Sequence, residues 1–312
     1  MTVPVIRTTR LTKSYGHERG VIDIDLEVLP GEVFGYLGPE GAGKTTTVRL
    51  LLDLIPPTSG QIELFGLDSR RDGVTIRRRL GSLPTELDLY ERLSGIELIR
   101  FFGRIRGGVD EIRVRAIADR LACDLDGEIG TLSRGDRQKV ALVQAFMNDA
   151  PLLILDDPLD GLDPLAQHEV GELIGEARRD GRTVFLSSHA PAEVQQLCDR
   201  VAIIREGRIM ATERMHELQD RAVRRVEIHF ARPVPPAAFV GLAGVDDADV
   251  SDSVVRCATH GSIAPLMHAA GQFEIVDILS VEPGLEETVL ALYSEADRPR
   301  RGARSGRLAA SA

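Results

Sequence analysis

EVFGYLGPEGAGKTT, residues 32–46, is the stretch of this 312-residue chain that decides its fold. Its first part, Glu32–Leu37, is almost wholly apolar, as expected of a strand buried on both faces. The second part fits the pattern G-x-x-x-x-G-K-[ST] and leads into a helical run, Thr46–Ile55, which Pro56 and Pro57 stop. Strand, glycine loop and helix in this order predict a loop that holds the phosphates of a nucleotide.

The residue types in this loop each suit phosphate binding. Glycines let successive backbone N–H groups turn towards an anion, and the helix start adds the positive end of its dipole. The Lys44 ammonium is long enough to reach the β- and γ-phosphates, and the Thr45 hydroxyl is suited to Mg²⁺. The alternative is a glycine-rich turn that binds nothing. The predicted loop residues are Gly38, Glu40, Gly41, Ala42, Gly43, Lys44, Thr45 and Thr46.

Two acidic residues follow a second apolar strand, Pro151–Leu155. An acidic pair at the end of a buried strand is costly unless it meets a cation, and Mg²⁺ at the phosphate loop is the obvious candidate. We predict that Asp156 is a magnesium ligand, held directly or through water, and that Asp157 orients or deprotonates the attacking water. The alternative is that one of the carboxylates only caps the following turn.

A third apolar strand, Thr183–His189, ends in a histidine. By itself such a histidine is more often structural than catalytic. Nucleotide sites in α/β sheets lie at the carboxyl ends of parallel strands, so the three polar strand ends should converge. We therefore expect His189 to sense the phosphate.

A further anion site is predicted before the apolar-periodic stretch Val140–Phe146. Ser133 is a good helix N-cap, and the exposed backbone of Gly135 beside a helix start is suited to phosphate. Asp160–Pro164, by contrast, has the composition of a turn.

Charge and composition exclude several classes of protein. The formal net charge is −10, and an acidic body argues against broad nucleic-acid binding. No apolar run approaches the ~18 residues of a membrane span, and the N-terminus lacks the apolar stretch of a secretory signal, so we expect a cytoplasmic protein. Cys123, Cys198 and Cys257 are far apart and are expected to be buried small hydrophobes. The basic tail, residues 297–312, should be disordered, either solvated or touching anionic lipid.

Together these motifs resemble the ATP-binding cassette (ABC) ATPases, in the order that family uses. GPEGAGKT (38–45) is similar to its Walker A, LSRGDRQ (132–138) to its signature loop, LLILDD (152–157) to its Walker B, DGLD (160–163) to its D-loop and SSH (187–189) to its switch histidine. The resemblance implies ATP and Mg²⁺ as cofactors. It implies catalytic Asp157 and His189, magnesium ligands Thr45, Asp156 and Thr85, and further nucleotide-binding residues Tyr15, which stacks on adenine, Ser133, Arg134, Gly135, Asp136 and Asp163.

The resemblance also implies an architecture and partners. The fold class is α/β, a P-loop NTPase cassette with a mixed sheet core, an antiparallel β part and a helical subdomain, followed by a small C-terminal α+β domain. We expect the cassette over 1–220, its helical subdomain at about 86–148, the C-terminal domain over 221–296 and the tail beyond. The family's cassettes pair head to tail with two-fold symmetry and drive a separate membrane permease, here at the cytoplasmic face of the membrane.

Five segments resemble those of type-2 drug and antibiotic exporters of actinobacteria: RTTRLTKSYG (7–16), GEVFGYLGP (31–39), Leu83–Tyr90, FLSSH (185–189) and CDRVAIIREGRI (198–209). The C-terminal domain, which we interpret as regulatory or dimer-supporting, also supports this resemblance. Its expected strands are Val226–Phe230, Val254–Ala258 and Phe273–Leu279, and its expected helices are Ser262–Ala270 and Pro283–Leu292. A permease helix is expected in the groove near Thr85–Gly107. Arg100, Arg104 and Arg106 either line that groove or form a solvated helix face.

The sequence departs from the family where hydrolysis is most sensitive. Asp157 stands where glutamate is usual, and a carboxylate drawn back by about 1 Å predicts slow hydrolysis. Thr85 replaces the usual glutamine, Glu40 the usual asparagine, and Asp136 the usual glutamine or asparagine. Two functions follow as alternatives: an ATP-hydrolysing export motor, or a weakly hydrolysing subunit that gates its permease by nucleotide binding. A nucleic-acid-linked cassette would need a coiled-coil insertion or a second cassette, which this sequence lacks.

Overall fold

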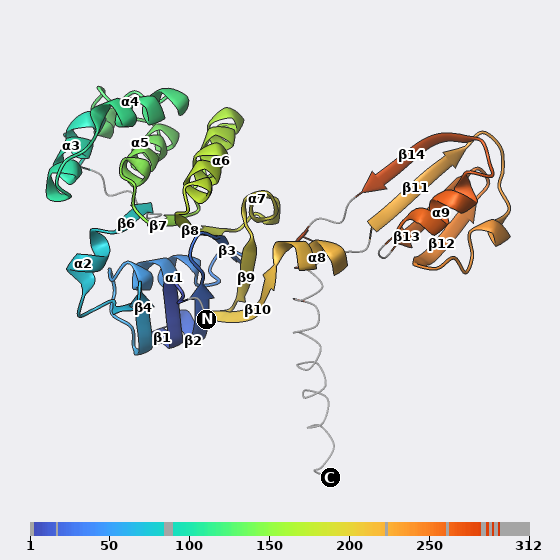
Figure 1. Cartoon of the computed structure of the whole chain (residues 1–312), viewed down its shortest axis with the longest axis horizontal. Helices are drawn as coiled ribbons and strands as arrows, with labels where there is room; N and C mark the ends of the chain where they lie inside the picture. The colour runs from blue at the N-terminus through green and yellow to red at the C-terminus, as the bar shows by residue number, and fades with distance from the viewer. Residues whose placement is uncertain are drawn as a thin grey trace, which may run out of the picture. The chain divides into compact units, whose positions relative to one another are not determined.

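The computed structural model describes residues 3–16, 18–83, 90–221, 224–259 and 262–281, with Leu285, Glu286, Val289 and Tyr293. The chain forms two compact units, Met1–Glu213 and Arg214–Ala312, so the division falls seven residues before the expected one (220 − 213) (Figure 1). Thr85, the tail and most of the expected helix Pro283–Leu292 lie outside the described residues. In the described part of the chain, no helix is long and apolar enough to cross a membrane.

The N-terminal part of the first unit is an antiparallel sheet with strand order β2-β1-β4-β5. Its strands are β1 (Ile6–Tyr15), β2 (Glu18–Val28), β4 (Ser59–Leu64) and β5 (Leu67–Asp68). In β2, Ile24, Leu26 and Val28 are buried and alternate with exposed residues. Ile22, which would continue this alternation, is 38% exposed. The ladder shifts register here and Asp23 has φ +51°, so a bulge turns Val21 inward instead.

The second sheet of this unit has the strand order β10-β9-β3-β8-β7-β6, and its inner pairs run parallel. Its strands are β3 (Val33–Leu37), β6 (Leu80–Leu83), β7 (Leu152–Asp156), β8 (Thr183–Ser188), β9 (Arg200–Arg205) and β10 (Arg208–Arg214). Every residue of β3, β7 and β8 is buried, which explains their apolar runs. Because β8 lies between β3 and β7, the predicted convergence of three strand ends is confirmed.

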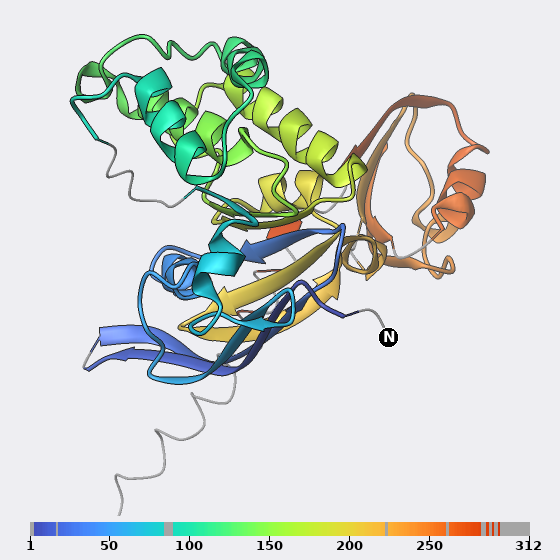
Figure 2. The ribbon, with the colours of Figure 1, turned by 60° about the vertical axis from the view of Figure 1, so that its left-hand side comes forward.

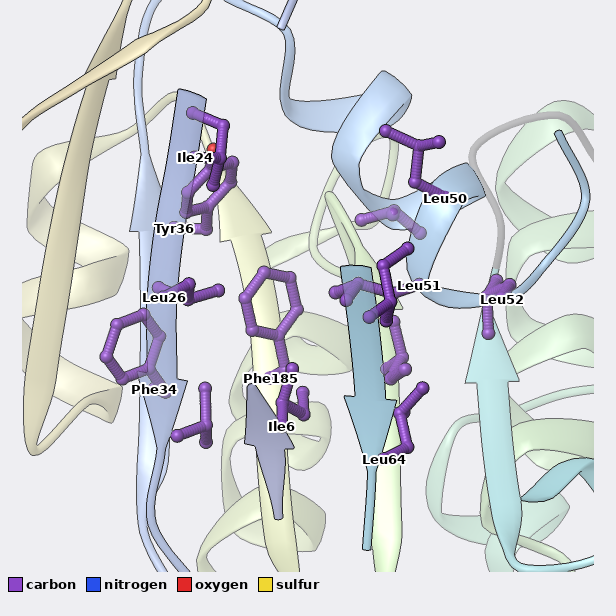
Figure 3. Close-up of a cluster of buried hydrophobic side chains, with 14 of the residues drawn as sticks. Ile6, Ile24, Leu26, Phe34, Tyr36, Leu50, Leu51, Leu52, Leu64 and Phe185 are labelled. Carbon is purple, nitrogen blue, oxygen red and sulfur yellow. The ribbon is translucent and has the colours of Figure 1, made fainter. Parts of the chain in front are cut away.

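The main core lies between the two sheets, around helix α1 (Lys44–Leu51). Figure 3 shows Ile24 and Leu26 from β2 facing Phe34, Tyr36 and Phe185 from the parallel sheet, with leucines of α1 beside them. Phe34 and Phe185 stack with ring centroids 6.1 Å apart. The helix stops earlier than expected: it ends at Leu51, and Asp53 adopts φ +56°, so a left-handed residue terminates it before the prolines.

Helices cover the opposite side of the central strands from the antiparallel sheet (Figure 2). They are α3 (Gly95–Ile105), α4 (Glu111–Arg120), η1 (Ile129–Thr131), α5 (Arg134–Phe146), α6 (Pro164–Arg179) and α7 (Pro191–Leu197), of which α3 to α5 form the helical subdomain. The short helix α2 (Gly73–Arg77) lies instead on the side of α1, with Ile76 in the core between the sheets. A capping box starts α3, where Ser94 and Glu97 satisfy each other's backbone N–H groups. Asp110 is the N-cap of α4, and its side chain accepts from two N–H groups of the first turn.

The second unit is an α+β domain with a sheet of order β12-β13-β11-β14. Its elements are α8 (Met215–Arg221), β11 (Arg224–Phe230), η2 (Pro236–Ala238), β12 (Val245–Ser251), β13 (Val254–Thr259), α9 (Ala264–Ala270) and β14 (Ile275–Val281). Phe230, Phe239 and Phe273 form its aromatic core, with centroids 5.7–6.0 Å apart. Of the expected C-terminal helix, Leu285 and Val289 are both buried. The acidic strand β12 was not predicted from the sequence.

Candidate nucleotide-binding and hydrolysis site

The loop between β3 and α1 has the backbone geometry of an anion cradle. Gly43 caps α1 with φ +106° and Gly41 has φ +71°, conformations that side-chain-bearing residues rarely adopt. At Gly38, a Cβ would lie 2.4 Å from the carbonyl oxygen of Ile204, so only glycine fits there. The first N–H groups of a helix generally lack intrahelical acceptors, so the start of α1 at Lys44 is suited to an anion.

Lys44 is buried, with 6% of the residue exposed, and its ammonium closes the loop. Its Nζ donates to the carbonyl oxygens of Gly38, at 2.9 Å, and Pro39, at 3.2 Å. Among the described residues, no carboxylate forms an ion pair with it. A buried ammonium held only by carbonyls has charge left to compensate, which fits a phosphate in the cradle.

Thr45 and Asp156 are the described residues that fit Mg²⁺. Thr45 follows Lys44 in the first turn of α1, and Asp156 ends β7 with 1% of the residue exposed. The Ser187 hydroxyl donates to the Asp156 carboxylate and fixes its orientation. In the described part of the chain, no three His, Cys, Asp or Glu side chains gather as a metal cage. One carboxylate and one hydroxyl suit Mg²⁺, which takes its other ligands from phosphates and water. Thr85, the third expected ligand, lies outside the described residues.

Asp157 and His189 meet beyond the ends of β7 and β8. The His189 Nδ1 lies 3.0 Å from Oδ1 of Asp157, whose side chain is 17% exposed. The Asp157 N–H donates to the Ser187 hydroxyl at 2.9 Å, so Ser187 joins the two neighbouring aspartates. Asp157 has φ +45°, a left-handed backbone that directs its side chain out of the strand. Sequence reasoning missed Ser187, although it lies in the SSH motif.

The signature loop begins α5 as predicted, with Ser133 as its N-cap. The Ser133 Oγ accepts from the Asp136 N–H at 3.1 Å and donates to the Asp136 carboxylate at 2.7 Å. The Asp136 charge is therefore drawn back to its own helix start, where the helix dipole stabilises it. Glu40, the other acidic departure, is exposed on the phosphate loop.

The signature loop also contacts the D-loop of the same chain. Arg134 Nη2 lies 2.6 Å from Asp160 Oδ2, and a Cβ on Gly135 would lie 2.8 Å from the Gly161 carbonyl oxygen. Lys139 Nζ lies 3.3 Å from Asp163 Oδ2, and Asp163 also caps α6. The Ala166 N–H and Lys139 together hold the pKa of Asp163 below its ordinary value. Arg134 and Asp163 are thus placed by contacts within one chain.

A pocket of about 390 Å³ lies where these loops meet the end of β7. It is lined by Leu132, Arg134, Arg137 and Gln138 of the signature segment and by Asp156, Asp157 and Asp160. Gln138 Nε2 lies 3.4 Å from the carbonyl oxygens of both Asp157 and Pro158. Sequence reasoning gave no role to Gln138, which ties α5 to the backbone that carries Asp157.

Gly207, in the turn between β9 and β10, ties the phosphate loop to the antiparallel sheet. Its N–H donates to Ala42 O at 2.9 Å, and its carbonyl accepts from Ile22 N–H at 2.8 Å. It has φ +76°, and a Cβ there would lie 2.3 Å from Gly20 O, so the position needs glycine. This turn joins the loop to the sheet that carries Tyr15.

Tyr15, at the end of β1, is an exposed aromatic, with 42% of the residue accessible. Lys13 Nζ lies 5.3 Å from its ring centroid and donates to Pro56 O at 2.8 Å. Replacing Tyr15 with alanine is expected to weaken ATP binding by about 1–3 kcal/mol, the value of one base–aromatic stack. Calorimetric titration with ATP measures this, and Tyr15→Phe is the matched control that keeps the ring. Equal affinity of Tyr15→Ala and wild type would remove Tyr15 from the site.

The fold and these motifs define the class of the protein as a P-loop nucleotide-binding cassette. The family model described as "ABC transporter" matches residues 21–160. The chain is 35% identical to the bacitracin transport ATP-binding protein BcrA of Bacillus licheniformis over 297 residues, covering 92% of this chain and 97% of that protein. We conclude that the chain belongs to the ABC transporter family as an ATP-binding subunit.

Other relatives and solved structures agree. The chain is 34% identical to a fluoroquinolones export ATP-binding protein of Mycobacterium tuberculosis over 262 residues, 81% of this chain and 86% of that one. It is 37% identical to Nod factor export ATP-binding protein I of Cupriavidus metallidurans over 225 residues, 70% and 74% of the two chains. A solved ATP-binding subunit of an ABC transporter superposes with a TM-score of 0.64 at 30% identity, covering 69% of this chain and 92% of that one.

A second solved cassette shows the same fold. The dimeric, post-hydrolysis cassette MJ0796 bound to ADP and Pi superposes with a TM-score of 0.62 at 22% identity, over 67% of this chain and 98% of that one. The expected α/β cassette fold is therefore confirmed.

Proposed function

We propose that this chain is the ATP-hydrolysing motor of an exporter for a drug, an antibiotic or another amphiphile. The observation that carries the proposal is the contact of Asp157 with His189 at the ends of two strands in the same sheet as β3, which leads into the loop of Lys44. The names of the relatives, which include bacitracin, fluoroquinolone and Nod factor export proteins, support export as the use of this ATPase.

The site divides the work of hydrolysis among its residues. Lys44 and the N–H groups of the loop bind the β- and γ-phosphates, and Mg²⁺, held by Thr45 and Asp156, would neutralise the charge that develops on them. Asp157 accepts a proton from the attacking water, and His189 holds that carboxylate in place and faces the γ-phosphate. Ser133 and Gly135 then serve the nucleotide of a second cassette in a two-fold, head-to-tail dimer.

The second candidate function is a subunit that gates its permease by binding ATP and hydrolyses it slowly. The short side chain of Asp157 favours it, because a carboxylate about 1 Å out of place costs on the order of 10²-fold in rate. Asp136 and Glu40 favour this second function less than their charge suggests. Asp136 is hydrogen-bonded to Ser133, and Glu40 is exposed, so neither charge needs to face the phosphates. Steady-state ATPase activity of the permease complex, with and without transported substrate, separates the two functions.

An apolar patch, formed by Tyr90 before α3 and by Phe101 and Ile105 on α3, supports a docking surface for the permease. Tyr90, Phe101 and Ile105 are 56%, 44% and 62% exposed, and the rings of Tyr90 and Phe101 are 5.9 Å apart. Two of the nearby arginines have partners within the chain: Arg100 pairs with Glu111, and Arg106 donates to Leu80 O at 2.6 Å. We propose that a cytoplasmic helix of the permease packs on the Tyr90–Phe101–Ile105 patch at the cytoplasmic face of the membrane.

Phe101→Glu is expected to reduce co-purification with the co-expressed permease by at least tenfold, because it places a charge in an apolar patch that the permease helix would bury. Its ATP affinity should match wild type, because α3 carries no predicted nucleotide contact. Val74→Glu is the matched control, an equally drastic change at a residue that is 63% exposed on α2. Wild-type co-purification of Phe101→Glu, or an equal loss in Val74→Glu, would contradict this surface. Failure of the wild-type chain to bind the permease, or to support efflux with it, would overturn the export function.

The C-terminal α+β unit is proposed to regulate or support the dimer. It has its own aromatic core, and among its described strands β14 lies at one edge of the sheet, with Val276 and Leu279 67% and 51% exposed. An apolar edge strand of this kind is suited to a partner.

A further inference from the structure

A second pocket, of about 310 Å³, lies between helices α4, α5 and α6 of the first unit. Figure 1 shows the three helices as neighbours. Its floor is apolar and buried, formed by Ile117, Phe146 and Leu173. None of its lining residues belongs to the proposed nucleotide site or to the α3 patch. It is therefore a separate cavity of a size that accepts a small ligand.

One buried cation lines this pocket. Arg182 is 6% exposed, its Nε donates to Ala150 O at 2.8 Å and its Nη2 donates to Asn148 O at 3.2 Å. No described residue hydrogen-bonds its Nη1, and no described carboxylate forms an ion pair with it. Since every fully buried polar side-chain atom in the described chain has a partner, this Nη1 borders open space, which the pocket supplies.

The charges around Arg182 leave it incompletely compensated. Burial lowers the pKa of Arg182, and the neighbouring charge of Arg113 lowers it further, while Asp149 and Asp180 act against this from a distance. Arg113 is paired with Asp149. A buried guanidinium that bonds only carbonyls retains most of the cost of its desolvated charge, and an anion in contact would relieve it.

We infer that this pocket binds a small amphipathic monoanion, a carboxylate on a compact apolar body. The carboxylate accepts from Nη1 of Arg182, and the apolar body lies on Ile117, Phe146 and Leu173. A single negative charge fits better than a phosphate dianion, because Glu176 and Asp180 also line the pocket. Glu176 is itself held by Arg120 at 2.9 Å, so Arg120 offers less to a ligand than Arg182 does.

Fluorescence titration of the full chain with 1-naphthoate tests this inference, and the absence of tryptophan from the sequence keeps the naphthalene signal clear. The neutral analogue 1-naphthalenemethanol has the same apolar body without the charge. We expect 1-naphthoate to bind at least tenfold more tightly than the alcohol, and saturating Mg-ATP to leave its affinity within twofold. Equal affinities of the two probes, or displacement of 1-naphthoate by ATP, would overturn the inference.

Two variants locate the binding, and both are titrated by calorimetry because a new tryptophan would overlap the naphthalene fluorescence. Ala116 is exposed on α4 and lines the pocket, so Ala116→Trp should obstruct it and lower 1-naphthoate affinity at least tenfold without disturbing the core. Ile112→Trp is the matched control, on the same helix, 83% exposed and outside the pocket. Arg182→Met should remove the preference for the anion over the alcohol. Wild-type binding in Ala116→Trp would overturn the inference even if Arg182→Met does not fold.

Discussion

Lys44→Ala is expected to weaken ATP binding by about 3 kcal/mol, or roughly a hundredfold in Kd, because a charge-assisted contact to a desolvated phosphate is lost. The ammonium is already buried and held by the carbonyls of Gly38 and Pro39, so it needs little reorganisation to meet the ligand. The effect should exceed that of Tyr15→Ala. Calorimetric titration with Mg-ATP measures both.

Lys44→Arg is the matched control for charge. It keeps a cation, but a planar guanidinium does not fit a cradle built around a compact ammonium, so we expect an intermediate affinity. Unfolding temperatures without nucleotide should be compared in parallel, since Lys44 also bonds its own loop. Unchanged ATP affinity in a folded Lys44→Ala protein would contradict the phosphate-loop assignment.

Asp157→Asn is expected to lower the rate of ATP hydrolysis by about 10²–10⁴-fold, the usual contribution of a general base. ATP affinity should change little, because the lost interaction acts on the attacking water and not on the bound nucleotide. Asparagine tolerates the left-handed backbone at this position, so the variant should fold. Single-turnover hydrolysis in the permease complex is the measurement, and equal rates for Asp157→Asn and wild type would remove Asp157 from the catalytic residues.

Asp157→Glu tests whether the short side chain limits the rate. A longer carboxylate that reaches the water should raise kcat with little effect on ATP affinity, because the gain is confined to the transition state. Glutamate is less suited than aspartate to φ +45°, so the variant should be less stable by about 1 kcal/mol. An unchanged or lower rate, with the His189 contact intact, would favour the subunit that only gates by binding.

The parts of the fold that could be predicted from the sequence depend on local patterns. Apolar runs gave β3, β7 and β8, and Ser133 marked the start of α5. The rule that parallel strands end at one edge then brought the polar strand ends together. These inferences succeed because burial on both faces and helix capping are each encoded within a few residues.

The parts that could not be predicted depend on contacts between distant segments. The bulge at Asp23, which exposes Ile22, follows from the register between β1 and β2. The Arg134–Asp160 pair and the open Arg182 guanidinium need the packed structure, since no spacing in the sequence reports them. Strand β12 could not be predicted because its acidic residues break the usual apolar alternation.

Gly207 has a consequence for how such a protein can diverge. Gly207 hydrogen-bonds Ala42 of the phosphate loop on one side and Ile22 of the antiparallel sheet on the other, in a conformation that side-chain-bearing residues rarely adopt. A substitution that shifts the antiparallel sheet, which carries Tyr15, must therefore also move the phosphate loop. If Tyr15 binds the base, base preference and triphosphate affinity should change together during evolution. Relatives of this chain should therefore differ in their transported substrate far more readily than in the nucleotide they use.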